Sequence, residues 1–193
     1  MTAAPDRRVW FNRFVRNLLL AIIPVAVVWT LITPWYNRFV AISGSNLVQL
    51  IESPNRTKLV PHDRHHAVVV RNDINTKKGF LSSIRTTDIH FNWIMFAVLV
   101  LATPTVPLSR RLRDLGVGTL ALALFHVLLA FLWVQFILTN QLGSWSAENY
   151  SAFSQNAWGL AKHLADLPFK FGLPLAVWAA LHLRELPREA DQA

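Results

Sequence analysis

Histidine and carboxylate side chains are the groups in this 193-residue chain that could ligate a metal or transfer a proton, because the sequence contains no cysteine. The segment PHDRHH places His62, His65 and His66 beside Asp63, and zinc and copper use ligands of these types. The spacing matches no compact ligand motif, and Arg64 stands inside the cluster. We therefore interpret it as a solvated loop or strand edge and expect no metal there.

A second polar group, DIHFN, precedes a long apolar segment. Alternate residues of a strand share one face, so Asp88, His90 and Asn92 would line one polar patch, which Arg71 or Arg85 could complete as an acid–base pair. No recognisable nucleophile accompanies them, and we predict that the chain is not an enzyme. In the alternative interpretation, Asp88 and Asn92 cap the N-terminus of the following helix.

Two histidines lie within apolar segments, where an ionisable side chain is a candidate for function. His126 lies in the middle of the third segment and His182 lies near the end of the fourth. Measured from the nearest flanking charge, their depths differ by about 15 Å at 1.5 Å per residue, which argues against a shared haem. We interpret His126 as hydrogen-bonded to a neighbouring helix. A pigment or haem contact at His126 is the alternative, and we otherwise expect no cofactor.

Composition points to a membrane protein. The chain is 53% hydrophobic and only 16% charged, whereas an average soluble domain is about 25% charged. About 20 apolar residues cross a bilayer, and four segments approach that length. The fourth is the weakest, because Lys170 lies near its start. The predicted fold is therefore membrane α-helical, with four transmembrane helices and a small extracytoplasmic α+β insertion, containing an antiparallel sheet, between helices 1 and 2.

The predicted organisation follows these apolar segments. A cytoplasmic segment (1–16) precedes the first transmembrane helix (17–37), an extracytoplasmic amphipathic helix with a small β domain (38–90), the second transmembrane helix (91–108), a cytoplasmic Arg-rich loop (109–114), the third transmembrane helix (115–138), an extracytoplasmic loop with a surface helix (139–166), the fourth transmembrane helix (167–183) and a cytoplasmic tail (184–193). TKLVP, HHAVVVRN and GFLSSIRTTDIHF are rich in Val, Ile and Thr, so they predict two to four short strands.

Arginines near the ends of these segments indicate orientation, since cytoplasmic loops carry an excess of basic residues. They precede the first segment, crowd residues 109–114, and follow the fourth segment as Arg184 and Arg188. We therefore predict a multi-pass protein of the bacterial inner membrane with both termini cytoplasmic. The net charge of +8 is attributed to topology and lipid head groups, not to nucleic acid. The predicted membrane-surface anchors are Arg13, Arg16, Trp35, Trp93, Arg110, Arg111 and Arg113.

The pair of segments HFNWIMFAVLVLATP and SRRLRDLGVGTLALALFHVL, after a first span, a surface helix and a small β-region, resembles the exosortase/archaeosortase group. The likeness is closest to the small membrane proteins that accompany exosortases and covers about residues 17–138. The family's catalytic group is a Cys with Arg and His. The Cys would lie where this chain has DIHFN, and the Arg expected late in the third span is also absent, which leaves His126 and Gln135. The resemblance thus implies a non-catalytic relative with a scaffold or accessory role.

These observations predict a non-catalytic accessory or structural subunit that stabilises a larger inner-membrane complex through its helices and extracytoplasmic cap. One alternative is an exosortase-associated factor in the processing of exported proteins. Another is a pigment- or haem-contacting subunit of a photosynthetic or respiratory complex. The expected partners are lipid and other integral membrane proteins of a hetero-oligomeric complex. The residues predicted to face a partner are Trp29, Trp133, Asp88, His90 and Asn92.

Overall fold

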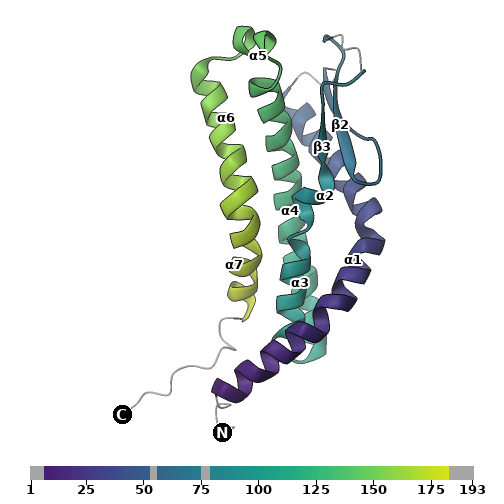
Figure 1. Ribbon diagram of the computed structural model, residues 1–193, viewed down its shortest axis with the longest axis vertical. Helices are drawn as coiled ribbons and strands as arrows, with labels where there is room; N and C mark the ends of the chain where they lie inside the picture. The colour runs from purple at the N-terminus through teal and green to yellow at the C-terminus, as the bar shows by residue number, and fades with distance from the viewer. Residues whose placement is uncertain (1–6, 53–55, 75–78, 183–193) are drawn as a thin grey trace. The chain divides into compact units, whose positions relative to one another are not determined.

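The computed structural model describes residues 7–52, 56–74 and 79–182 (Figure 1), so the predictions for the first six residues and for 183–193, including Arg184 and Arg188, lie outside the described residues. The chain is mostly helical. Its elements are α1 (Arg7–Ile51), β1 (Thr57–Pro61), β2 (His66–Arg71), β3 (Ser82–Arg85), α2 (Thr86–His90), α3 (Trp93–Ala102), α4 (Leu108–Asn140), α5 (Ser144–Asn149), α6 (Ala152–Leu164), a π-helical turn (Ala165–Phe169) and α7 (Lys170–His182).

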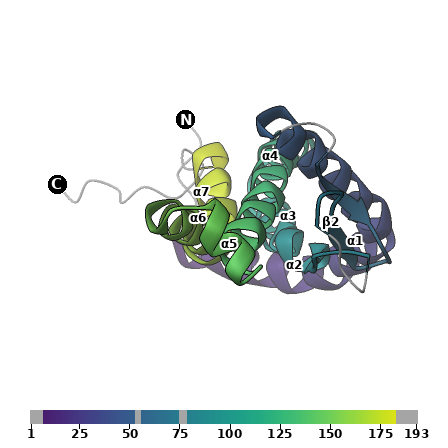
Figure 2. The same ribbon diagram turned by 90° about the horizontal axis from the view of Figure 1, so that it is seen from above.

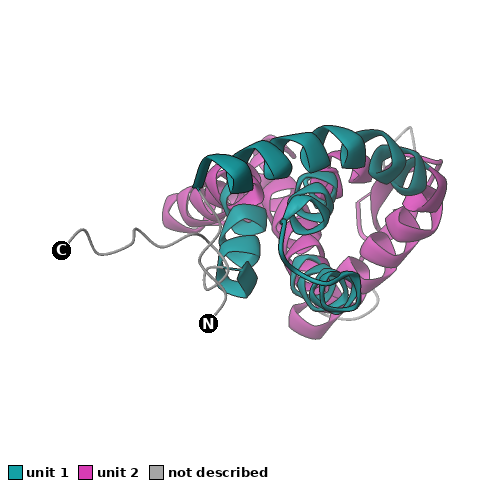
Figure 3. Ribbon diagram, turned by 90° about the horizontal axis from the view of Figure 1, so that it is seen from below, with its two compact units in different colours: residues 1–30, 92–122, 172–193 teal, residues 31–91, 123–171 magenta. Residues whose placement is uncertain are grey.

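The chain divides into two compact units (Figure 3). Unit 1 comprises residues 1–30, 92–122 and 172–193, and unit 2 comprises residues 31–91 and 123–171. The long helices α1 and α4 each contribute one part to each unit.

Three helices are long and apolar enough to cross a membrane: Arg7–Ile51, Leu108–Asn140 and the continuous helix Ala152–His182. The second predicted span differs from these, because it corresponds to the shorter apolar helix Thr86–Ala102, which is about 25 Å long against a hydrocarbon core of roughly 30 Å. Its regular part α3 has 10 residues. Thr103 precedes Pro104, and a residue before proline disfavours helical geometry. Thr105 then adopts a positive φ of 69°, so the helix ends here.

The long helices continue past boundaries that charge alone suggests. Helix α1 extends beyond Arg38 to Ile51, so the predicted surface helix of the 38–90 loop is the C-terminal part of the same helix. Likewise α6, the π-helical turn and α7 form one helix, which joins the predicted second surface helix to the fourth apolar segment. Charged residues mark where apolar sequence ends, but Arg and Lys are good helix formers and do not end a helix.

Unit 2 contains the predicted small antiparallel sheet, which has three strands in the order β1-β2-β3. The register pairs Leu59 with Val69 and Ala67 with Ile84. These four residues belong to the buried core, because alternate side chains of a strand point to one face. The sheet lies beside the C-terminal part of α1 (Figures 1 and 2), as expected for a sheet too small to be stable alone.

The core of unit 2 joins this sheet to α1 and α4. Val40 and Val48 of α1 and Leu129 of α4 are fully buried in the same cluster. Gly44 allows α1 to approach α4 closely, because a Cβ placed on Gly44 would lie 3.1 Å from the Cβ of Ala130.

Unit 1 is packed largely through aromatic side chains. Trp29 of α1 stacks on Trp93 of α3 with 4.5 Å between ring centroids. Phe96 is fully buried and lies against Gly118 of α4, where an added Cβ would lie only 1.9 Å from the Phe96 ring. Unit 1 therefore tolerates no side chain at position 118 without rearrangement.

Candidate functional site

Four polar side chains of unit 2 form a connected cluster that includes His90 and His126, and three of them are buried whereas Tyr36 is partly buried. Tyr36 and Asn37 are consecutive on α1, His90 ends α2, and His126 lies in α4. His90 and His126 have no exposed surface, and Asn37 is 4% exposed. Consecutive helical residues point about 100° apart, and the Tyr36 hydroxyl and the Asn37 amide pair with different histidines.

Tyr36 lies next to both histidine rings. Its hydroxyl is 2.8 Å from Nδ1 of His126. The Tyr36 ring is edge-on to His90 at 4.9 Å and to His126 at 5.8 Å between centroids. The two histidine rings are themselves 6.1 Å apart. The expectation that His126 bonds to a neighbouring helix is therefore met by Tyr36 of α1.

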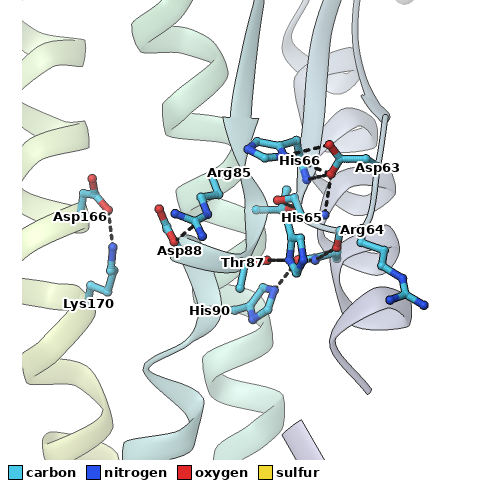
Figure 4. Close-up of polar contacts among 12 residues, drawn as sticks. Asp63, Arg64, His65, His66, Arg85, Thr87, Asp88, His90, Asp166 and Lys170 are labelled. Atoms are coloured by element: carbon cyan, nitrogen blue, oxygen red, sulfur yellow. Dashed lines mark hydrogen bonds and ion pairs between the residues drawn. The ribbon is translucent and has the colours of Figure 1, made fainter. Parts of the chain in front are cut away.

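Asn37 connects His90 to the turn between β1 and β2. Its Nδ2 donates to the carbonyl oxygen of Arg64 at 2.6 Å and to Oγ1 of Thr87 at 3.2 Å. Its Oδ1 is therefore the acceptor that pairs with Nε2 of His90, and this ring nitrogen carries the proton. Oγ1 of Thr87 also lies 3.1 Å from Nδ1 of His65, and Figure 4 shows Thr87 beside His65.

This arrangement orients its own side chains and contains no nucleophile of the serine or cysteine type among its members. Because Nδ1 of His126 is paired with Tyr36, a pigment or haem iron would have to bind through Nε2. A side chain with no exposed surface offers no open side to a ring of that size. Among residues 7–52, 56–74 and 79–182, no group of three His, Cys, Asp or Glu side chains could hold a metal ion.

The PHDRHH segment forms a turn organised by Asp63. One oxygen of the carboxylate accepts hydrogen bonds from the backbone N–H groups of His65 and His66, each at 2.7 Å, and Nδ1 of His66 lies 3.0 Å away. The backbone hydrogen bond from His65 is the main cause that lowers the pKa of Asp63 to about 2. The structure thus agrees with a solvated turn (Figure 4).

The predicted patch of Asp88, His90 and Asn92 is wrong, because Thr86–His90 is a helix and not a strand. In a helix, Asp88 and His90 point about 200° apart. Asp88 has a 59% exposed side chain 3.6 Å from Arg85, whereas His90 is buried. Asn92 is 1% exposed and makes no side-chain capping bond at α3, so the capping interpretation also fails for Asn92.

The tryptophans predicted as partner contacts or membrane anchors lie in different environments. Trp29 is 4% exposed and stacks on Trp93, whose Nε1 donates to Oγ1 of Thr119 at 2.8 Å. Both rings thus pack inside unit 1, and neither is exposed as a partner surface or a membrane anchor. Trp35 is 69% exposed, as expected of an anchor.

Trp133 lines a cavity of about 180 Å³ in unit 2. Two ion pairs also line it, Arg85 with Asp88 at 3.6 Å and Lys170 with Asp166 at 2.8 Å (Figure 4). Each cation already has a carboxylate partner, so the cavity is polar without a strong preference for either sign of charge.

The predicted basic anchors of the 109–114 segment also act inside unit 1. Arg111 donates to the carbonyl oxygens of Leu101 and Val106 at 2.7 and 2.8 Å, which satisfies an acceptor at the C-terminus of α3. Arg113 donates to Asp114 at 3.0 Å. Arg110 lies 3.7 Å from the same carboxylate, whereas Arg13 and Arg16 are exposed.

Sequence reasoning missed Tyr36, Asn37 and Asp114. The available signal was a Tyr-Asn pair at the end of the first apolar segment, but its partners are distant in sequence and only the fold reveals them. No protein-family model matches the chain, and neither does any curated protein or solved structure.

Proposed function

We propose that the chain is a multi-pass protein of the bacterial inner membrane that acts as a non-catalytic accessory subunit of a larger membrane complex. The supporting observation is that large apolar side chains lie outside while polar ones lie inside. In α1, Leu20, Ile23 and Leu31 are 69%, 71% and 65% exposed, although His90 and His126 are buried. Only 17% of the most apolar window of α1 is buried, against 56% for α4.

Such exposed apolar surface requires either lipid or the helices of a partner. The polar network supports an accessory role, because its hydrogen bonds join α1 to α2, to α4 and to the turn between β1 and β2. The mechanism is packing: exposed faces of α1 and of Ala152–His182 contact lipid and partner helices, and the sheet docks a partner's outer domain by its edge.

The proposed topology has four crossings with both termini cytoplasmic. Thr86–Ala102 would be the second crossing, at about 25 Å, with help from tilt of its neighbours or local bilayer thinning. The absence of cysteine allows a direct test by single-cysteine labelling in whole cells. Lys58→Cys and Glu148→Cys should react with a membrane-impermeant maleimide, and Ser109→Cys should react only after lysis. Labelling of all three in intact cells would contradict this topology.

The partner is tested by placing a photoreactive amino acid at Leu20 or Ile23 of α1. Illumination of cells should yield a discrete adduct with another membrane protein, identified by mass spectrometry after purification in mild detergent. The same amino acid at Glu148, outside the apolar face, is the matched control. A chain that purifies alone and forms no protein adduct from either α1 position would overturn the subunit proposal.

A second candidate function is favoured by one observation. His90 comes from the DIHFN segment, where the family resemblance expects a catalytic Cys, and His126 comes from the third apolar segment; their rings are 6.1 Å apart. This pair supports a proposal that the chain is a substituted exosortase relative that assists the processing of exported proteins. Deleting the gene should then leave exported proteins incompletely processed, and unchanged processing of these proteins would exclude this role.

A further inference from the structure

A groove of about 280 Å³ lies in unit 2 between α1 and the turn that joins β1 to β2. Its principal lining residues are Trp35 and Arg38 from α1 and Pro61, His62 and Arg64 from the turn. The groove is separate from the buried network and from the cavity beside Trp133. Pockets for drug-sized ligands measure about 300–1,000 Å³. The groove lies just below this range, so its volume suits a small group such as a lipid head group.

The lining is basic. Arg38 and Arg64 supply two guanidinium groups from different elements, and both residues are exposed. The carboxylate of Asp63 also belongs to the lining, but it is engaged by the backbone N–H groups of His65 and His66. Two arginines against one ionised aspartate leave the lining with a net charge of +1 when His62 is neutral, so the groove favours an anion.

A hydrogen bond of Asn37 fixes the positions of Arg38 and Arg64 relative to each other. Nδ2 of Asn37 donates to the carbonyl oxygen of Arg64 at 2.6 Å, and Asn37 directly precedes Arg38 in α1. One buried amide therefore fixes the turn that carries Arg64 to the helical turn that carries Arg38. Preorganisation of this kind lowers the entropy lost when a ligand binds.

An exposed apolar stripe runs along α1 next to the groove. Leu31, Trp35, Phe39 and Ile42 are 65%, 69%, 45% and 53% exposed, and their spacing of three or four residues places them on one side of the helix. Arg38 follows Trp35 by three residues and shares this side. The stripe lies within a helix long and apolar enough to cross a membrane.

We propose that this groove binds the phosphate of an anionic phospholipid, with Arg38 and Arg64 on the phosphate and the acyl chains along the stripe. Guanidinium groups match phosphate oxygens in charge and geometry, and an exposed tryptophan prefers the membrane interface. The inference rests on the proposed membrane insertion, but it requires no partner protein.

The test is native mass spectrometry of the purified full-length chain with phosphatidylglycerol or phosphatidylcholine of identical acyl chains. The expected result is preferential retention of phosphatidylglycerol. Each of Arg38→Gln and Arg64→Gln should weaken it about fivefold, and the double variant about 25-fold. Arg85→Gln is the matched control, because its side chain is 62% exposed and lies outside the groove. Competition by 10 mM inorganic phosphate would assign the site to free phosphate, and resistance would assign it to lipid.

Two results would overturn the proposal: equal retention of the two lipids, or a loss in Arg38→Gln and Arg64→Gln no larger than in Arg85→Gln. Circular dichroism of each variant establishes that folding is retained. Trp35→Ala should weaken both lipids alike, because an uncharged ring contributes apolar contact that the two lipids share. If cysteine labelling supports the topology but the chain shows no preference for phosphatidylglycerol, the proposed lipid site is disproved and the proposed membrane insertion stands.

Discussion

The two units differ in the partners of their buried histidines. In unit 2, His90 and His126 are paired with the neutral groups of Asn37 and Tyr36. In unit 1, the buried His182 lies 3.6 Å from the carboxylate of Asp114, which is 2% exposed. Asp114 lies in the first turns of α4, because residues 109–114 are helical and not the loop that the sequence predicts.

Unit 2 therefore holds its buried histidines with neutral hydrogen-bond partners and places its buried charges elsewhere, in Lys162 and Lys170 beside Asp166. In unit 1 the buried histidine lies beside a carboxylate.

The helix contacts differ in the same way. Each unit has a glycine in α1 or α4 at a close approach, but an added Cβ would lie 3.1 Å from Ala130 at Gly44 and 1.9 Å from Phe96 at Gly118. Unit 1 is therefore the less tolerant of added volume.

The largest effect is expected from Gly118→Ala in unit 1. The new methyl group would overlap the ring of Phe96, which is fully buried, and overpacking of this kind should cost about 3 kcal/mol. The free energy of unfolding in SDS titration of the detergent-solubilised chain is the measurement.

Gly116→Ala is the matched control, because an added Cβ at Gly116 meets nothing within 4 Å. It should stabilise α4 by about 1 kcal/mol through helix propensity. Gly44→Ala in unit 2 should fall between the two variants. Equal effects of the changes at 116 and 118 would mean that Phe96 does not pack against α4 as described.

Asp114→Asn should produce the next largest effect, again in unit 1. The carboxylate lies 3.0 Å from Arg113 and 3.6 Å from Nε2 of the buried His182. We expect a loss of about 2 kcal/mol, below the 3–5 kcal/mol of a fully buried pair, because the guanidinium of Arg113 is exposed to solvent. Asp88→Asn, an exposed acid in unit 2, is the control and should be almost neutral in the same titration.

Part of the fold of both units could be predicted from the sequence. The three apolar helices and the small antiparallel sheet follow from composition and from β-branched runs such as HAVVVR, since both signals are local. The end of α3 was missed, although TPTVP contains two prolines, because hydropathy does not record where a helix breaks. The pairs Tyr36–His126 and Asn37–His90 were out of reach, since only tertiary packing brings together residues so distant in sequence.

Tyr36→Phe tests the hydrogen-bond geometry of unit 2. The change removes the hydroxyl that pairs with Nδ1 of His126 and leaves that nitrogen buried. A double-mutant cycle with His126→Phe should give a coupling free energy of about 1 kcal/mol, in the range found for polar pairs between membrane helices. The matched control is a cycle of Tyr36→Phe with Asp114→Asn, which lies in the other unit. Coupling that is equal in both cycles would show that the effect is not specific to this contact.

Asp63 gives the smallest effect, and it is confined to acid pH. Its pKa is lowered from the ordinary 3.8 to about 2 in the folded chain, so its carboxylate stabilises unit 2 fully above pH 3.8. This stabilisation is lost as the pH falls through 2, because the folded state then takes up the proton. Asp63→Asn should therefore lower the melting temperature slightly at pH 5 and by less at pH 2, with Lys58→Gln as the control. A difference from wild type that stays constant between these pH values would contradict the role of the charge and would leave only the hydrogen-bonding oxygen, which asparagine retains.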